Sequence, residues 1–223
     1  MSDERVVAVI PALNEKRTIQ MVVEDVLVHT DEVIVVDDGS TDETSKRARD
    51  AGAVVRKHET NMGYDRSIDE GFSLAAERGA TIVFTFDADG QHHAGDIPKM
   101  INPVITEEFD VVVGQRPAKA RFVERLFATY TQTRLCVADP LCGFKVYRTE
   151  VYREVGHFDT YSTIGTQLML EAKKRGYRIQ QRRISLDERE DKSRFGQQLE
   201  ANWKILRAMI RLIWFDLTTP SPK

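Results

Sequence analysis

Several features that would each define a class of protein are missing from this chain of 223 residues. No apolar run approaches the roughly 18 residues that a membrane-spanning helix needs. The first residues, Met-Ser-Asp-Glu-Arg, lack the basic and then apolar pattern of a signal peptide. Two cysteines, Cys136 and Cys142, are too few for a disulfide framework and are not spaced as a metal site. We therefore expect a cytoplasmic protein.

Two widespread nucleotide-binding motifs are also missing. The sequence contains neither Gly-x-Gly-x-x-Gly nor the phosphate-loop pattern that ends in Gly-Lys-(Ser/Thr). These patterns place glycines where the backbone must approach a pyrophosphate closely. Their absence argues against dinucleotide-dependent dehydrogenases and against P-loop enzymes.

The charges that are present are unevenly distributed. Residues 1–115 carry 11 basic and 23 acidic side chains, a net charge of −12, whereas residues 116–223 carry 21 and 12, a net charge of +9. The acidic half can hold a cation and the basic half an anion. No nucleic-acid motif is visible and the pI is near 6, so we expect no nucleic-acid partner.

Short apolar runs alternate with helical patterns through the first half of the chain. The expected strands are 5–10, 32–36, 53–57, 81–86 and 109–114, and the expected helices are 14–29, a segment after Ser40, 63–78 and 97–106. Such alternation predicts an α/β fold with a mostly parallel central sheet flanked by helices.

The second half is less regular. We expect a basic segment, helical or partly mobile, at 117–134, strands at 143–147 and 177–184, and helices at 163–175 and 197–215, with a charged loop at 187–195. No repeat or linker interrupts the chain, so we expect a single domain over 1–223.

The apolar run Thr81–Phe86 ends in two carboxylates, Asp87 and Asp89. Ligands of open α/β sheets bind just beyond the carboxyl ends of the strands. Paired carboxylates there suit a hard divalent cation that keeps substrate phosphate oxygens among its ligands. The segment therefore predicts a metal–diphosphate site, and an acidic turn without a ligand is the alternative.

Three strand ends taken together resemble the nucleotide-binding half of family 2 glycosyltransferases, which have the GT-A fold, and in particular the dolichyl- or polyprenyl-phosphate mannose and glucose synthases. The segments are Pro11-Ala12-Leu13-Asn14-Glu15, Asp37-Asp38-Gly39-Ser40 and Asp87-Ala88-Asp89-Gly90-Gln91-His92. The resemblance extends to about Phe195. It implies that residues 1–115 bind a nucleotide sugar and residues 116–223 form the acceptor side.

The resemblance implies a role for individual residues. The nucleotide-sugar pocket would comprise Pro11, Ala12, Leu13, Glu15, Asp38, Gly63, Asp87, Ala88 and Asp89. Mg²⁺ or Mn²⁺ would be held on the donor diphosphate by Asp87, Asp89 and Gln91. Asp38 suits a base N–H because a carboxylate only accepts hydrogen bonds, and turn formation is its alternative. We expect His92 and His93 to be structural or surface residues.

Three later segments resemble acceptor-side motifs of the same family. They are Val113-Gly114-Gln115-Arg116, Asp139-Pro140-Leu141-Cys142-Gly143-Phe144-Lys145 and Arg189-Glu190-Asp191-Lys192-Ser193-Arg194. The resemblance implies that Asp139 lies near the reacting sugar and that Arg116, Arg189 and Arg194 contact phosphates. The alternatives are a turn cap for Asp139 and a solvated charged loop for 189–194.

The chain departs from the family pattern at three positions. Asp65 and Arg66 replace small residues, and Gln167 stands where many members have Glu. These changes leave the donor motifs untouched but bear on the sugar and the acceptor site.

The resulting hypothesis is an inverting, metal-dependent transfer of a hexose from a GDP-mannose- or UDP-glucose-type donor to polyprenyl or dolichyl phosphate. A phosphate acceptor is already charged and needs no strong base. A glycan hydroxyl is the alternative acceptor, and it would need a base such as Asp139. A catalytically silent nucleotide-sugar-binding module is the rival from another class.

The C-terminal helical pattern points to a membrane surface. Apolar residues recur at three- and four-residue intervals, with basic residues on another face, and Trp214 and Phe215 add interfacial aromatics. The apolar positions are Leu199, Trp203, Leu206, Ile210 and Ile213. Such a helix can lie at an anionic lipid surface, which predicts a peripheral protein on the cytoplasmic face, with an integral-membrane partner as a further possibility. Alternatively, the stripe covers the protein's own sheet.

Overall fold

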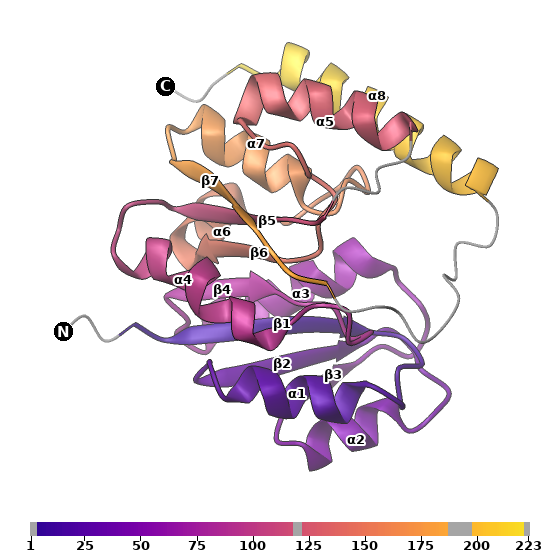
Figure 1. Cartoon of the computed structure of the whole chain (residues 1–223). Helices are drawn as coiled ribbons and strands as arrows, with labels where there is room; N and C mark the ends of the chain where they lie inside the picture. Colours follow the sequence, from indigo (N-terminus) through magenta and orange to yellow (C-terminus); the bar gives the residue numbers. More distant parts are fainter. Residues whose placement is uncertain (1–3, 118–121, 187–197, 221–223) are drawn as a thin grey trace.

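The computed structural model describes residues 4–117, 122–186 and 198–220. In these ranges a seven-stranded sheet, in the order β3-β2-β1-β4-β6-β5-β7, lies between two layers of helices (Figure 1). The strand pairs are parallel except at β6, which runs antiparallel to both β4 and β5. The expected α/β class and mostly parallel sheet are therefore confirmed.

The strands are β1 (Val6–Ala12), β2 (Glu32–Asp37), β3 (Val54–Lys57), β4 (Ile82–Thr85), β5 (Val111–Gln115), β6 (Lys145–Arg148) and β7 (Ile179–Arg183). The helices are α1 (Ile19–Leu27), α2 (Thr44–Asp50), α3 (Tyr64–Glu77), α4 (Ile97–Ile105), α5 (Phe122–Leu135), α6 (Thr149–Val155), α7 (Thr166–Lys174) and α8 (Gln198–Thr218), with a short 3₁₀ turn at Ala94–Asp96.

Alternate side chains of the central strands enter two separate cores. In β1, Val6, Ala8 and Ile10 pack with α1, α2 and α4, whereas Val7 and Val9 pack with the other helices on the opposite face. A strand that is buried on both sides reads as a continuous apolar run, which is why β1, β2, β4 and β5 are visible in the sequence.

The strand β6 was expected, but its direction was not. The chain returns from α5 through residues 136–144 and enters the sheet between β4 and β5 from their carboxyl ends. This antiparallel entry places the segment before β6 beside the ends of the parallel strands, where ligands of α/β sheets bind. The short helix α6 follows β6 at once and was not expected.

In the part of the chain that the structure describes, no helix is both long enough and apolar enough to cross a membrane.

Candidate active site

The carboxyl ends of β1, β2 and β4 lie side by side, with β1 in the middle. The strand register pairs Ala12 with Asp37 and Val9 with Thr85. The chain goes from β1 outward to β2 and β3 and then returns to place β4 on the other side of β1. This reversal is the switch point at which open α/β sheets bind ligands, and the three acidic motifs of the sequence meet there.

Hydrogen bonds join the loops that follow β1 and β2. The backbone N–H of Asn14 donates to Ser40 Oγ at 2.8 Å, and that of Glu15 donates to Thr44 Oγ1 at 2.8 Å. Asn14 adopts a φ of 55°, a left-handed conformation that Asn tolerates better than most residues. The segment containing Leu13 and Glu15 is therefore fixed against the start of α2.

The side chain of Asp87 is held from two sides. His92 Nε2 donates to Oδ2 at 3.0 Å and the Tyr64 hydroxyl to Oδ1 at 3.3 Å. Burial alone would raise the pKa of Asp87, but the hydrogen bond and charge of His92, with Lys145 and Tyr64, outweigh it and hold the pKa below its usual range. Asp87 is therefore kept ionised, as a metal ligand must be.

The residues after Asp87 form a compact turn. Asp89 Oδ1 accepts the backbone N–H of Gln91 at 3.1 Å, and the carbonyl of Ala88 accepts the Thr18 hydroxyl at 2.7 Å. The Asp89 and Gln91 side chains are half-exposed, whereas Ala88 is buried. The turn thus presents polar side chains while its backbone is anchored to the N-terminal end of α1.

The oxygen ligands present fit a divalent cation that shares its coordination sphere with a substrate. The described residues contain no group of three or more His, Cys, Asp or Glu side chains able to hold a metal by themselves. Asp87 and Asp89 are hard oxygen donors of the type that Mg²⁺ and Mn²⁺ prefer, and Mg²⁺ commonly binds through one or two carboxylates plus phosphates and water. The donor set therefore suits a metal–diphosphate site and not a metal cage built from protein alone.

The carboxylate of Asp38 is buried and hydrogen-bonded. Its Oδ1 accepts the N–H of Met62 at 2.7 Å and His58 Nδ1 at 2.8 Å, and its Oδ2 accepts the N–H of Gly63 at 2.8 Å. Gly63 has a φ of 96° and lies directly before α3. Asp38 therefore ties the end of β2 to the start of α3, and its contacts with Met62 and His58 were not expected from the sequence.

Arg116 and Asp139 form a bidentate ion pair. Arg116 Nε and Nη2 donate to the two Asp139 oxygens at 2.8 Å each, and the backbone N–H of Arg116 donates to Oδ2 at 3.0 Å. Burial alone would lower the pKa of Arg116, but the hydrogen bonds and charge of Asp139 have the larger effect and raise that pKa above its usual value. The two residues were expected separately, at a phosphate and at the sugar, and the structure joins them.

The segment before β6 lies directly against the end of β4. A Cβ on Gly143 would lie 2.7 Å from the carboxyl carbon of Asp87, so a glycine is required there. The carbonyl of Gly143 accepts the Thr85 hydroxyl at 2.5 Å. The Asp139–Lys145 motif and the Asp87–Gln91 motif are thus parts of one site.

Two of the departures from the family pattern have partners in the structure. Burial and the charge of Asp159 raise the pKa of Asp65 to about 7, against the opposing effect of Lys145. Lys145 is fully buried and donates to the carbonyls of Cys142 and Ile164 at 2.6 and 2.5 Å. Gln167 is buried within α7, where its Oε1 accepts the backbone N–H of Thr160 at 2.8 Å.

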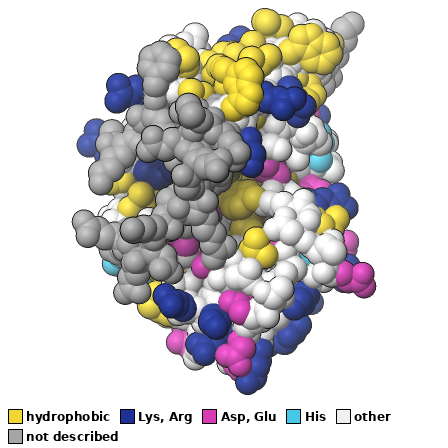
Figure 2. Space-filling view, turned by 90° about the vertical axis from the view of Figure 1, so that its right-hand side faces the viewer, with side chains coloured by type: hydrophobic (Ala, Val, Ile, Leu, Met, Phe, Trp, Pro, Cys, Tyr) yellow, Lys and Arg dark blue, Asp and Glu magenta, His cyan; other side chains and the backbone are white. Residues whose placement is uncertain are grey.

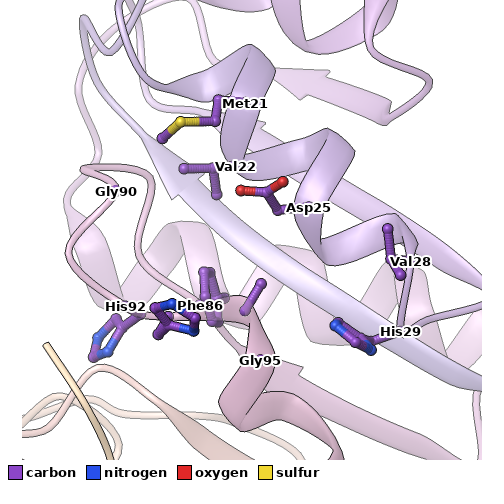
Figure 3. A pocket seen from close by; sticks show the side chains of 11 residues that line it. Met21, Val22, Asp25, Val28, His29, Phe86, Gly90, His92 and Gly95 are labelled. Atoms are coloured by element: carbon purple, nitrogen blue, oxygen red, sulfur yellow. The ribbon is translucent and has the colours of Figure 1, made fainter. Parts of the chain in front are cut away.

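A groove of about 340 Å³ borders the turn after β4 on the side of α1 (Figure 3). One side is lined by Met21 and Val22 of α1 and by Val28, which directly follows that helix. The other side is lined by Phe86 and the segment from Gly90 to Gly95. His92 lines the groove and also contacts Asp87, so it lies between this groove and the Asp87 carboxylate.

The remaining sequence predictions fall in two groups. Arg189 and Arg194 lie outside the described residues, so their expected phosphate contacts stay predictions. His92 is buried and His93 is exposed, which agrees with the expectation that they are structural or surface residues. The sequence analysis missed His58, Tyr64 and Lys145, although His58 directly follows the strand next to Asp38 and adjacency of strand ends is a usable signal.

The architecture is that of a known class of sugar-transferring enzymes. The solved structure of glucosyl-3-phosphoglycerate synthase from Mycobacterium tuberculosis, in complex with Mn²⁺, UDP and glucosyl-3-phosphoglycerate, matches with a TM-score of 0.80. The match covers 98% of this chain and 82% of that one at 24% identity. The likeness identifies the fold as GT-A.

The family follows from the sequence comparison. The model described as "Glycosyl transferase family 2" matches residues 7–156, and the chain belongs to this family and is a glycosyltransferase.

Two curated relatives are similar over part of their length. UDP-N-acetylglucosamine–dolichyl-phosphate N-acetylglucosaminyltransferase from Methanococcus voltae is 37% identical over 52% of this chain and 53% of its own length. Dodecaprenyl-phosphate galacturonate synthase from Rhizobium johnstonii is 30% identical over 66% of this chain and 48% of its own length. The matches thus span about half the length of these two relatives.

Proposed function

We propose that the protein transfers a hexose, with inversion, from a nucleoside-diphosphate sugar of the GDP-mannose or UDP-glucose type to polyprenyl or dolichyl phosphate. The observation that carries the proposal is that Gly143, four residues after Asp139 of the Arg116–Asp139 pair, lies directly against the Asp87 carboxylate. Two curated relatives carry dolichyl phosphate and dodecaprenyl phosphate in their names, and these names support this acceptor class.

The donor would bind across the ends of β1, β2 and β4. Pro11, Ala12, Leu13, Glu15 and Asp38 would line the base and ribose pocket, with Gly63 and Ala88 completing it. Asp87, Asp89 and Gln91 would hold Mg²⁺ or Mn²⁺, which neutralises charge on the leaving diphosphate. The M. tuberculosis synthase was solved with Mn²⁺ and UDP, which supports a divalent ion and a nucleotide here.

A phosphate acceptor agrees better with the acceptor side than a hydroxyl does. The acceptor phosphate oxygen attacks the anomeric carbon and the nucleoside diphosphate leaves, so no proton has to be removed by a strong base. Both oxygens of Asp139 already accept hydrogen bonds from Arg116, which disfavours Asp139 as that base. We therefore rank a glycan hydroxyl acceptor second. A silent binding module remains the rival from another class.

Transfer of label from nucleotide sugars to polyprenyl phosphate tests the proposal. GDP-mannose, UDP-glucose and UDP-N-acetylglucosamine are each offered with Mg²⁺ or Mn²⁺, and a glycan acceptor is run in parallel. We expect a labelled lipid that disappears in EDTA and in Asp89→Ala but survives in the matched surface variant Asp50→Ala. Product in excess EDTA, or full activity of Asp89→Ala, would contradict the metal site.

The other outcomes separate the alternatives. Label on the glycan alone would favour the hydroxyl acceptor, whereas hydrolysis of the donor without any acceptor would exclude the silent module. Nucleotide binding without transfer or hydrolysis would favour that module.

We further propose that the protein works on the cytoplasmic face of a membrane through α8. Its inner face, Ala208, Leu212 and Phe215, packs against the protein. Its outer face carries Trp203, Ile210, Trp214 and Leu217, which are 62%, 55%, 66% and 79% exposed. Figure 2 shows hydrophobic side chains gathered at this end of the molecule beside Lys and Arg. The helix therefore covers the core and also exposes a second apolar stripe.

Charge and side-chain chemistry favour an anionic lipid surface as the partner of this outer face. Lys204, Arg207 and Arg211 are exposed on the same helix. Tryptophan is favoured at the level of the lipid headgroups, and nearby basic residues add attraction to anionic lipid. The two kinds of side chain that a peripheral helix needs at a headgroup layer, apolar and basic, are thus both present on α8. An integral-membrane partner would bind the same stripe.

Vesicle co-sedimentation distinguishes these readings. We expect binding to anionic but not to neutral vesicles, weakened by salt and by the double change Trp203→Ser and Trp214→Ser. Val28→Ser removes an exposed apolar side chain elsewhere and serves as the matched control. Equal sedimentation of the double variant and the native protein would rule out the stripe as the membrane contact.

A further inference from the structure

The end of β3 places a histidine between two carboxylates, one of which belongs to the donor site. His58 directly follows β3, and its side chain is 4% exposed. Its Nδ1 lies 2.8 Å from Asp38 Oδ1 and its Nε2 lies 2.7 Å from Glu70 Oε2 on α3. The backbone N–H of His58 donates to the carbonyl of Asp37 at 2.9 Å, so the ring has little freedom to move.

The hydrogen-bond chemistry fixes the charge of this ring. Ionised carboxylates only accept hydrogen bonds, so both ring nitrogens must carry a proton to satisfy Asp38 and Glu70 together. Burial by itself lowers the pKa of His58, but Asp38 and Glu70 outweigh it and raise that pKa above its usual value. The ring is therefore an imidazolium near neutral pH.

Further charged groups lie near the two carboxylates that contact the ring. Arg56 Nε donates to Glu70 Oε1 at 2.6 Å, which places a second cation at the outer carboxylate. On the inner side Lys57 Nζ lies 3.9 Å from Asp37 Oδ2 and donates to the carbonyl of Ser40 at 3.0 Å. Asp38 therefore depends on His58 for its nearest positive charge.

The same bond decides which oxygen of Asp38 remains for a ligand. Oδ1 accepts two donors, His58 and the N–H of Met62, and these occupy its two lone pairs. Oδ2 accepts one donor among the described residues, the N–H of Gly63. The second lone pair of Oδ2 can thus accept an N–H from a nucleobase.

We propose that His58 is a positioning residue for the donor nucleotide: as an imidazolium bonded to Glu70, it orients the Asp38 carboxylate so that Oδ2 accepts a base N–H. The proposal rests on the placement of the donor base at Asp38. When His58 loses a proton, the one that remains lies on either ring nitrogen, and the molecules in which it faces Glu70 lose the hydrogen bond to Asp38. Nucleotide affinity therefore falls as pH rises through the pKa of His58.

Calorimetric titration with UDP and with GDP, from about pH 6.5 to about pH 9, tests this dependence. In the native protein the Kd is constant at the lower end and rises above the pKa of His58. In His58→Gln the Kd is about tenfold weaker, the factor for losing one charge-assisted hydrogen bond, and is independent of pH. In Glu70→Gln the amide can donate to the unprotonated Nε2 of a neutral ring, which then keeps its Nδ1 proton on Asp38, so the Kd stays near native and no longer rises with pH.

The loss of the pH dependence in Glu70→Gln is the decisive readout, since a merely structural role of His58 would not change a pH profile. Glu70 is half-exposed, so its variant remains informative if His58→Gln fails to fold. Long-range ¹H–¹⁵N spectra of the histidine rings, assigned by comparison with His58→Gln, measure the protonation of His58 directly. Two protonated nitrogens near neutral pH are expected, and a neutral ring there would overturn the proposal.

The donor site and the role of His58 fail in different ways. A native protein that binds neither nucleotide at any pH, and an Asp38→Asn variant with native affinity, would each remove the base from Asp38 and overturn both. Nucleotide binding that Asp38→Asn weakens but that is the same in the native protein, His58→Gln and Glu70→Gln at every pH overturns only the role of His58.

Discussion

Three carboxylates of the candidate site each accept a hydrogen bond from a residue that is distant in the sequence. Asp87 accepts from His92 and Tyr64, Asp38 accepts from a backbone turn and a histidine, and Asp139 accepts from an arginine. Carboxylates that are bonded in this way keep their orientation before a ligand arrives, so little rearrangement is needed on binding. Substitution of these donors should therefore impair the site, as substitution of the carboxylates themselves should.

Loss of the His92 side chain is expected to weaken metal binding without unfolding the protein. In His92→Asn the bond to Asp87 Oδ2 is lost, and residues that support metal ligands typically contribute about 10–100-fold in metal affinity or activity. The measurement is the Mn²⁺ concentration that gives half-maximal transfer. His93→Asn is the matched control, because His93 is exposed. Equal metal requirements in the two variants would contradict the role of His92.

We expect the two-donor geometry of the Arg116 guanidinium to contribute more to kcat/KM than its charge does. Lysine keeps the charge in Arg116→Lys but cannot donate two parallel hydrogen bonds to Asp139. We expect a loss of about tenfold or more in kcat/KM, corresponding to one charge-assisted hydrogen bond of about 1.5–3 kcal/mol. Arg47→Lys, at an exposed pair with Glu43, should leave kcat/KM unchanged. A native value for Arg116→Lys would show that the paired geometry is not required.

These pairings explain how much of the site could be predicted from the sequence. The carboxylates stand at the ends of apolar runs, and parallel strands bring such ends together, so Asp38, Asp87 and Asp89 were identifiable. The pairing of Arg116 with Asp139 was not, because the two residues lie 23 positions apart in the sequence and no local pattern indicates that they meet. His92 illustrates the difficulty, since nothing local distinguishes it from His93.

At the scale of helices and strands, local sequence patterns predict some elements and not others. Strands buried on both faces, such as β1 and β2, follow from long apolar runs. The direction of β6 does not, because a four-residue strand carries no signal for parallel or antiparallel pairing, and α6 is too short for helical periodicity. In α8, Trp203 and Ile210 of the expected apolar stripe are exposed, whereas Ala208 and Leu212 on another face pack against the protein, and contact of the exposed stripe with a membrane stays a prediction.

The anchor of α8 is a buried carboxylate that receives three donors. Asp216 accepts the Tyr130 hydroxyl and the Arg134 guanidinium of α5, and Lys174 Nζ of α7 lies 3.1 Å away. The side chain of Asp216 is 1% exposed. Breaking one partner of a buried pair typically costs about 3–5 kcal/mol because the remaining charges lose their compensation.

We therefore expect Asp216→Asn to lower the free energy of unfolding by about 3 kcal/mol at neutral pH. Burial opposes ionisation of Asp216, but Arg134, Tyr130 and Lys174 outweigh it and lower its pKa to about 2 from 3.8. The stabilisation is thus complete above the unfolded value and is lost as pH falls toward about 2, so the native–variant difference should shrink below about pH 4.

Urea unfolding at several pH values measures this difference. Glu43→Gln, at an exposed pair in α2, is the control and should change the free energy of unfolding by less than about 1 kcal/mol. A difference between native protein and Asp216→Asn that does not change with pH would mean that lost packing, not lost charge, destabilises the variant.

At the scale of the whole molecule, the two oppositely charged halves contribute strands to one sheet. Strands β1 to β5 come from residues 1–115, β6 and β7 come from the second half, and β6 lies between β4 and β5. Helix α8 packs beside α5 at the far end from β3 (Figure 1). The candidate donor site and α8 are therefore connected through a continuous hydrogen-bonded sheet and the core on the α8 side of that sheet, and we expect them to unfold together.

Tryptophan fluorescence makes this expectation measurable, because both tryptophans, Trp203 and Trp214, belong to α8. A nucleotide and Mn²⁺ at about 100 times the Kd should stabilise the fold by about 2.7 kcal/mol. For a chain of this size that raises Tm by roughly 5–10 °C. The rise should be equal by fluorescence, which reports α8, and by far-UV circular dichroism, which reports the whole fold. EDTA should remove the part that depends on Mn²⁺. A fluorescence transition that lies below the circular-dichroism transition and does not respond to ligand would instead make α8 a separately unfolding element, whose stability depends on whatever covers its outer stripe.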